Sequence, residues 1–148
     1  MVDTNNLSEI KHLRTEEIAN QKEPHSDYLF KVIMIGDPGS GKTCMLKRLI
    51  ENKYLEGQVT LGVEFQSFLL KIEDSSSKLQ IWDTAGQENF RSVTKVFYRN
   101  THAVMLCYPI NQLQSFENLK HWINEIRTHC SPDVLIFLCG TKCDLAND

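Results

Sequence analysis

The pattern of hydrophobic and polar positions changes at residue 28 of the chain. Residues 1–27 are polar, and their few apolar side chains fall near one helical face, at Leu7, Ile10, Leu13 and Ile18. This spacing predicts a short helix that ends before Pro24. A solvated extension explains the same composition. With both alternatives open, we expect residues 1–27 to form a polar N-terminal extension.

A strand, a glycine-rich turn and a helix are predicted next, in that order. Residues 29–35 form a short apolar run that is rich in strand formers and stops at Gly36. Residues 41–52 then carry apolar side chains at helical spacing, namely Met45, Leu46, Leu49 and Ile50. This succession is typical of the first unit of a parallel α/β fold.

A hairpin is predicted between residues 63 and 83. Residues 63–72 alternate between apolar and polar side chains, and residues 78–83 read as a returning strand. The three serines at 75–77 predict the turn between them. One strand of this hairpin is expected to be an antiparallel edge strand.

The remaining elements predict a sheet that is covered on both faces. Residues 103–108 and 134–139 are continuous apolar runs, and helical patterns occupy 88–100 and 116–126. Continuous rather than alternating apolar strands are typical of sheets between two layers of helices. The predicted fold class is therefore α/β, with a mainly parallel sheet, one antiparallel edge strand and helices on both faces.

Composition narrows the class of protein. The 148 residues, 41% of them hydrophobic and 24% charged, suit one globular domain. A net charge of −3 gives no general attraction to nucleic acid. The 5 cysteines, an odd number, indicate reduced thiols in the cytoplasm. No apolar run reaches the roughly 20 residues of a membrane span, and the N-terminus is too polar for a signal peptide. We expect a cytoplasmic protein without nucleic-acid partner or direct membrane insertion.

A phosphate-binding loop is predicted at residues 36–43. Their sequence, Gly-Asp-Pro-Gly-Ser-Gly-Lys-Thr, matches G-x-x-x-x-G-K-[ST] between a predicted strand and a predicted helix. Glycines let backbone N–H groups turn toward phosphate oxygens, and the helix N-terminus adds its positive dipole end. We expect Lys42 to reach the β- and γ-phosphates and the Thr43 hydroxyl to bind Mg²⁺. A plain glycine-rich turn is the alternative, but it does not explain the position between strand and helix. The motif predicts a P-loop NTPase.

A second motif follows the hairpin. Residues 82–88 read Trp-Asp-Thr-Ala-Gly-Gln-Glu, and a carboxylate such as Asp83 at the end of a strand suits a water-bridged Mg²⁺. Together with the phosphate loop, this motif resembles the Ras-like small GTPases. Residues 60–65 (Thr-Leu-Gly-Val-Glu-Phe) and residues 78–98 resemble the Rab branch in particular.

The resemblance implies roles in binding and hydrolysing GTP. Mg²⁺ would be held by Thr43, Thr60 and Asp83. Gln87 would orient the attacking water, with Lys42 and Thr60 as further catalytic residues, and the Gly86 N–H would bind the γ-phosphate. Loss of that phosphate would release both switch segments. The resemblance implies nucleotide contacts, to GTP or GDP, from Asp37, Pro38, Gly39, Ser40, Gly41, Lys42, Thr43, Cys44, Tyr54, Thr60, Gly86, Lys142 and Asp144.

Protein partners are also implied by the resemblance. Phe65, Trp82 and Phe97 match the aromatic triad on the effector face of the Rab branch. Exposed aromatics commonly anchor interfaces. Three core aromatics at ordinary spacing are the alternative interpretation. Effector, exchange-factor and GTPase-activating proteins would bind through the switch regions.

The guanine-binding motif departs from the family pattern. Residues 141–144 read Thr-Lys-Cys-Asp where the family carries N-K-x-D. Asp144 can still accept hydrogen bonds from guanine, and the Lys142 stem can pack on the base. Thr141 lacks the amide of asparagine, so we expect nucleotide affinity to be weaker by about 1–2 kcal/mol.

Two further departures concern the phosphate loop and the first switch. Pro38 occupies a position that usually carries glycine or serine, and its fixed φ and missing N–H would restrict the loop near Gln87. Tyr54 lies six residues before Thr60, where the family usually shows seven. It would either stack on the guanine edge or face solvent.

Residues 28–148 are expected to form a small-GTPase G domain that lacks the final strand, the final helix and the cysteine-bearing tail of the family. The chain would be a fragment of a longer protein or a truncated form with impaired nucleotide binding, and membrane association would require a prenylated tail. In either case residues 134–139 would be an uncovered sheet edge. The expected function is a Rab-like switch that hydrolyses GTP to GDP and recruits effectors in vesicle trafficking. The alternative is a nucleotide-binding or pseudo-GTPase scaffold with little turnover.

Overall fold

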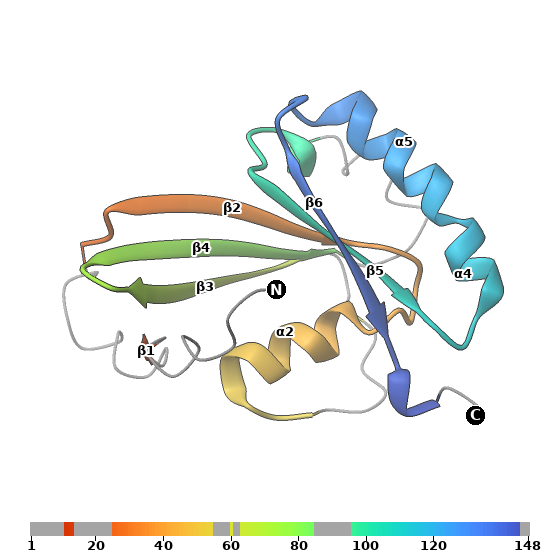
Figure 1. Ribbon diagram of the computed structural model, residues 1–148, viewed down its shortest axis with the longest axis horizontal. Coiled ribbons are helices and arrows are strands. Elements are labelled where there is room, and N and C mark those ends of the chain that lie inside the picture. The colour runs from red at the N-terminus through yellow and green to blue at the C-terminus, as the bar shows by residue number, and fades with distance from the viewer. Residues whose placement is uncertain (1–10, 14–24, 55–59, 61–62, 85–95, 146–148) are drawn as a thin grey trace.

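One mixed sheet organises the fold. The computed structural model describes residues 11–13, 25–54, 60, 63–84 and 96–145. Within this part of the chain, the strands are β1 (Lys11–Leu13), β2 (Tyr28–Ile35), β3 (Val63–Ile72), β4 (Ser75–Thr84), β5 (Ala103–Pro109) and β6 (Leu135–Thr141). The helices are α2 (Lys42–Glu51), α4 (Leu113–Glu117) and α5 (Leu119–His129), followed after β6 by a 3₁₀ turn at Cys143–Leu145. The strands lie in the order β1-β3-β4-β2-β5-β6 (Figure 1).

The sheet is mainly parallel, as the sequence predicts. Strand β2 pairs in parallel with β4 and β5, and β5 pairs in parallel with β6. The predicted hairpin is the antiparallel pair of β3 and β4. Because parallel strands point the same way, β2, β4, β5 and β6 all end at one edge of the sheet. Loops that follow strands at such an edge are where α/β proteins bind ligands.

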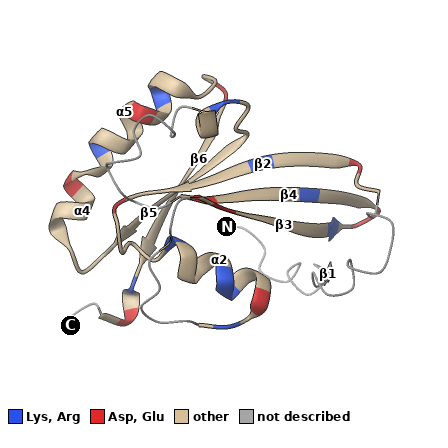
Figure 2. Ribbon diagram, turned by 180° about the vertical axis from the view of Figure 1, so that it is seen from behind, with Lys and Arg blue, Asp and Glu red and all other residues tan. Residues whose placement is uncertain are grey.

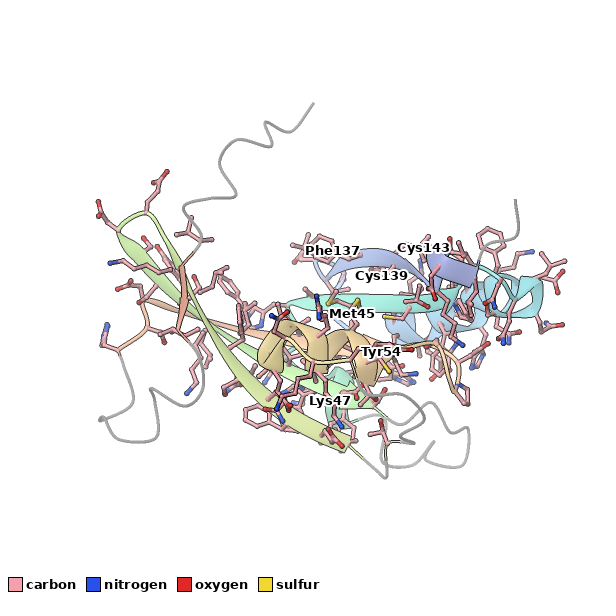
Figure 3. All side chains as sticks on the ribbon, turned by 90° about the horizontal axis from the view of Figure 1, so that it is seen from below. Met45, Lys47, Tyr54, Phe137, Cys139 and Cys143 are labelled. Carbon is pink, nitrogen blue, oxygen red and sulfur yellow. The ribbon has the colours of Figure 1, made fainter. Side chains whose placement is uncertain are left out.

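Helices cover both faces, which confirms the predicted fold class. Helix α2 lies against one face, and α4 and α5 lie against the other (Figure 1). Strand β2 serves both layers, because its side chains alternate between the faces. Val32 and Met34 pack with Leu46 of α2, whereas Ile33 and Ile35 pack against the α5 face. Met45 of α2 and Cys139 of β6 both pack against the cluster on the α2 face (Figure 3).

The hairpin turn lies earlier than the sequence predicts. Ile72 pairs with Ser75, so the turn consists of residues 73–74, and Glu73 adopts a left-handed conformation with φ 52°. The prediction of a turn at the three serines is wrong. These serines begin β4, where Ser76 donates its N–H to the Asp27 carboxylate at 2.7 Å. Small polar residues are compatible with a strand end whose side chains find such partners.

Three other elements differ in detail from the prediction. Residues 11–13 form a strand, not a helix, and pair antiparallel with β3. An exposed strand edge offers backbone partners that helical periodicity does not reveal. The helix predicted at 116–126 is two helices, which meet at Asn118. Of the helix predicted at 88–100, residues 96–98 are helical and residues 88–95 lie outside the described part.

Strand β6 occupies the end of the strand order. The side chains of its first four residues, 135–138, are between 42% and 60% exposed although all are apolar. Charged residues are interspersed over helices and strands and do not gather on one face in the view of Figure 2. Among the described residues, no helix combines the length and apolar character that a bilayer span requires.

Candidate functional site

The loop after β2 has a backbone that only glycine can form at its first position. Gly36 has φ 141°, and a Cβ at this residue would lie 2.0 Å from the carbonyl oxygen of Cys107 in β5. Any side chain would therefore force the loop away from the sheet. The loop is thus seated directly on the end of the neighbouring strand.

Helix α2 begins without a side-chain cap. Its N-cap residue is Gly41, with φ 86° and ψ 9°, and among the described residues no side chain makes a capping hydrogen bond there. The first N–H groups of a helix have no partner within the helix, and they attract anions together with the helix dipole. The first turn also contains no acidic residue. This end of α2 is suited to bind phosphate oxygens.

The ammonium group of Lys42 lies over the same loop. Lys42 is 5% exposed, and its Nζ donates to the carbonyl oxygens of Gly36 and Asp37, both at 2.9 Å. A third contact, at 3.2 Å, joins Nζ to Ser40 Oγ. Burial lowers the pKa of Lys42, and the negative charge of Asp83 opposes that shift. The carbonyl oxygens thus fix a buried cation at the mouth of the loop, where it can attract phosphate.

Three side-chain oxygens converge beside the loop, although they come from distant segments. The Thr43 hydroxyl donates to Asp83 Oδ2 at 2.5 Å and contacts the hydroxyl of Thr60. Thr60 lies 3.5 Å from the same carboxylate oxygen. Thr60 is 8% exposed and Asp83 is fully buried. The predicted metal residues are therefore brought together.

The donor set fits Mg²⁺. All three side chains offer oxygen, which this hard cation prefers. Asp83 Oδ1 is buried and has no hydrogen-bond partner among the described residues. Burial raises the pKa of Asp83, and the bond from Thr43 and the charge of Lys42 oppose this shift. A buried carboxylate oxygen without a partner is costly unless a cation or its bound water satisfies it.

The remaining loop residues differ in exposure. Pro38 and Gly39 are exposed, Ser40 is fully buried, and Cys44 is half-buried. The Asp37 side chain turns to the other layer of the fold, where Trp122 and Asn118 donate to its two oxygens. Gly86 and Gln87, predicted to bind the γ-phosphate and to orient water, lie outside the described residues.

The predicted base-binding residues are less closely gathered. Tyr54 is 69% exposed and follows the C-terminal end of α2 (Figure 3). Lys142 is half-buried with φ 58°, and Asp144 is exposed in the 3₁₀ turn after β6. Tyr54 is thus exposed to solvent in this structure, and its stacking on the guanine edge stays a prediction. Asp144 is exposed and therefore accessible to a ligand.

Thr141 makes a contact that the sequence analysis missed. Its hydroxyl lies 2.7 Å from the carbonyl oxygen of Ser40 in the phosphate loop and 3.2 Å from that of Tyr108. A Cβ at Gly41 would lie 3.6 Å from Thr141 Cβ and Oγ1. The end of β6 therefore abuts the loop and is tied to it by this threonine. The sequence did indicate that Thr141 lies near the end of a parallel strand, where ligands bind. It could not indicate the partner of its hydroxyl, because Ser40 is 101 residues away in sequence.

The three predicted effector-face aromatics form one cluster. The ring centroids of Phe65 and Trp82 are 4.9 Å apart, and those of Trp82 and Phe97 are 5.5 Å apart. Phe65 is 45% exposed, and the other two are half-buried. Lys31 Nζ lies 5.4 Å from the Trp82 ring centroid. The cluster is thus neither fully buried nor scattered, and its role in binding partners stays a prediction.

Comparison with known proteins identifies the family. A family model described as "Ras family" matches residues 31–148. "Ras-related protein RIC1" from Oryza sativa subsp. japonica is 45% identical over 126 residues, which are 84% of this chain and 62% of that protein. "Ras-related protein RABD2c" from Arabidopsis thaliana is 45% identical over 125 residues, 84% of this chain and 62% of that protein. "Ras-related protein Rab-19" from Bos taurus is 42% identical over 128 residues, 86% and 59% of the two chains.

The chain belongs to the Ras family. Its resemblance to Rab-type small GTPases is confirmed, because several of these relatives carry Rab names. The chain spans about 60% of the length of the relatives it matches.

Proposed function

We propose that this chain is a Rab-like molecular switch that binds GTP and GDP with Mg²⁺, hydrolyses GTP to GDP, and recruits effector proteins in vesicle trafficking. The observation that carries the proposal is the meeting of Thr43, Thr60 and Asp83 beside the buried ammonium of Lys42. Mg²⁺ and Lys42 together would neutralise the charge that develops on the transferred phosphoryl group.

Each residue has a separate task in this proposal. The first N–H groups of α2 bind phosphate oxygens, and Lys42 balances their charge. Thr43 and Thr60 offer hydroxyl oxygens to Mg²⁺, and Asp83 holds its bound water. Because Thr60 belongs to a different segment from Thr43, a bound nucleotide can bring the two residues together or let them separate, and this change would make the site a switch.

Partners would read that state on the aromatic cluster of Phe65, Trp82 and Phe97. The cluster adjoins the metal site through β4, since Trp82 directly precedes Asp83 in that strand. A change at the γ-phosphate can therefore reach the partner-binding face over a short distance. Exchange factors and GTPase-activating proteins would act on the same switch regions, in the cytoplasm.

A nucleotide-binding scaffold with little turnover is the second candidate. Two observations favour it: Thr141 replaces the asparagine of the guanine motif, and exposed Pro38 occupies the phosphate loop. Neither residue disturbs the oxygen cluster of the metal site. The two candidates thus share phosphate binding and differ in hydrolysis.

Single-turnover hydrolysis of GTP separates the candidates. The purified chain is loaded with GTP, and phosphate release is followed with and without Mg²⁺, next to the nucleotide content after purification. We expect bound GDP and Mg²⁺-dependent turnover. Gln87→Leu should slow the rate at least about tenfold, because it removes the group that orients water.

Gln112→Leu is the matched control, since Gln112 is an exposed residue at the start of α4 and belongs to none of the motifs of the site. Its rate should equal that of the parent. Bound nucleotide without turnover would favour the scaffold, and a chain that binds no guanine nucleotide would reject both candidates.

A further inference from the structure

The Asp37 side chain belongs to the phosphate loop in sequence, but it bonds to the opposite layer of the fold. Its Oδ1 accepts a hydrogen bond from Trp122 Nε1 at 2.8 Å, and its Oδ2 accepts one from Asn118 Nδ2, also at 2.8 Å. Both oxygens of the carboxylate are thus bound by neutral donors from the N-terminal end of α5. Hydrogen bonds to an ionised acceptor are stronger than those between neutral groups.

The two donors belong to a helix, α5, that is held in place by its packing against the core. Asn118 is the N-cap of α5 and Trp122 lies one turn later, so both side chains share one helix face. Leu119 and Ile126 anchor α5 in the core, beneath Ile33 and Ile35 of β2. Helix α4 is attached as well, since the buried Ser115 hydroxyl contacts the carbonyl oxygens of Pro109 and Gln112.

The backbone of Asp37 faces the other way. Its carbonyl oxygen accepts from Lys42 Nζ at 2.9 Å, on the side of the loop where α2 begins. One residue therefore presents a carbonyl to the phosphate-binding lysine and a carboxylate to α5. This arrangement places the negative charge of the Asp37 side chain on the α5 side of the loop, away from the side where α2 begins.

We propose that Asp37 is a positioning residue for phosphate binding, tied to α5 by Asn118 and Trp122. The two bonds fix the loop to the core and keep the carboxylate directed away from the bound phosphates. A carboxylate released toward the loop would repel them, because like charges at short range are strongly unfavourable where water is excluded. The inference rests on the proposed function, since it concerns the loop that would bind the nucleotide.

Trp122→Phe tests the tie, because it keeps an aromatic ring and removes the N–H donor. It also removes ring volume, and the double-mutant cycle with Asp37→Asn separates that packing loss from the loss of the bond. Tyr98→Phe is the control: the Tyr98 hydroxyl is buried and has no hydrogen-bond partner in the described part of the chain. Asn118→Ser is a second variant, since serine also serves as a helix N-cap but does not extend as far. The 148-residue chain is used throughout.

The first measurement is amide hydrogen exchange of residues 37 and 39–41 in the nucleotide-free chain. We expect exchange to become about tenfold faster in Trp122→Phe and in Asn118→Ser, and to stay unchanged in Tyr98→Phe. Unchanged exchange in both test variants would overturn the inference. This measurement needs no nucleotide, so it judges the tie even if the proposed function fails.

The second measurement is the dissociation constant for GDP in a double-mutant cycle. Trp122→Phe should raise this constant about tenfold in the parent. In an Asp37→Asn background, where no charge remains to be directed, the same change should have less than about a twofold effect. An equal loss in both backgrounds would show that Trp122 acts only by packing, and would overturn the inference. A parent chain that binds no GDP would contradict the proposed function alone.

Discussion

The two ends of the proposed nucleotide site are built differently. At the phosphate and metal end, Lys42, Thr60 and Asp83 are each no more than 8% exposed, and they contact one another or the loop. At the base end, Tyr54 is 69% exposed and Asp144 is exposed in a short 3₁₀ turn. The first end is assembled by the fold itself, whereas the second is an open surface.

The difference follows from charge. A triphosphate and a divalent cation must be taken from water, and their binding is favourable only where compensating groups are already in place. A base carries no net charge and has apolar faces, so it can be bound by side chains that gather around it. The contrast predicts that single substitutions at the buried end weaken binding more than substitutions at the exposed end.

The largest effect is expected from Lys42→Met. This change removes the buried cation while it keeps a long apolar side chain, so the phosphates would lose their nearest compensating charge. The dissociation constant for GDP, measured by titration with a fluorescent analogue, should rise at least about 100-fold. Lys47→Met, on the same helix, is the control and should leave the constant within about twofold. A Lys42→Met chain that binds as tightly as the parent would show that the loop does not bind phosphate.

Asp83→Asn should have the next largest effect, and its sign depends on Mg²⁺. Without metal, the substitution removes a buried charge whose Oδ1 has no partner in the described part of the chain, so the melting temperature should rise. With Mg²⁺ and GDP, the parent should gain stability that the variant lacks. Loss of a group that orients metal-bound water weakens metal binding by about 10–100-fold.

Thermal melting in EDTA and in Mg²⁺ checks both halves of this prediction. Asp74→Asn is the control, because Asp74 is exposed at the hairpin turn. Its melting temperature should change equally in the two buffers. A lower melting temperature for Asp83→Asn in EDTA would contradict the argument from burial.

The same contrast explains how much of the fold could be predicted from sequence. The strands at 29–35 and 103–108 and the helix at 41–52 are each found within one residue of the predicted limits. The two strands are continuous apolar runs with Gly36 or Pro109 at the end, and the helix follows a glycine and carries apolar side chains at helical spacing. The hairpin turn was misplaced, since three serines suggest a turn as readily as an exposed strand end. The strand at residues 11–13 could not be predicted, because the partner that the described residues show for it is the edge of β3, far away in sequence.

Some features of the site could likewise be predicted from the sequence, and others could not. The positions of Lys42, Thr43 and Asp83 follow from motifs in which spacing along the chain fixes geometry in space. The bonds of Asp37 to Asn118 and Trp122, and of Thr141 to Ser40, cross 81 or more residues, and no local pattern encodes them. Thr141 could be recognised in the sequence as a departure from the motif, but its hydrogen bond to the loop could not.

The smallest effect is expected at Thr141, where the two ends of the site meet. Asparagine at this position would restore the amide of the family motif, so Thr141→Asn should tighten GDP binding by about 1–2 kcal/mol. Thr141→Val keeps the shape of the side chain but removes the hydroxyl that contacts the carbonyl oxygen of Ser40, and should weaken binding by about 1 kcal/mol. Titration of the three chains with GDP gives the order valine, threonine, asparagine from weakest to tightest. If threonine and asparagine bind equally well, the hydroxyl contact to Ser40 already supplies what the amide would, and the base end is not weakened by this residue.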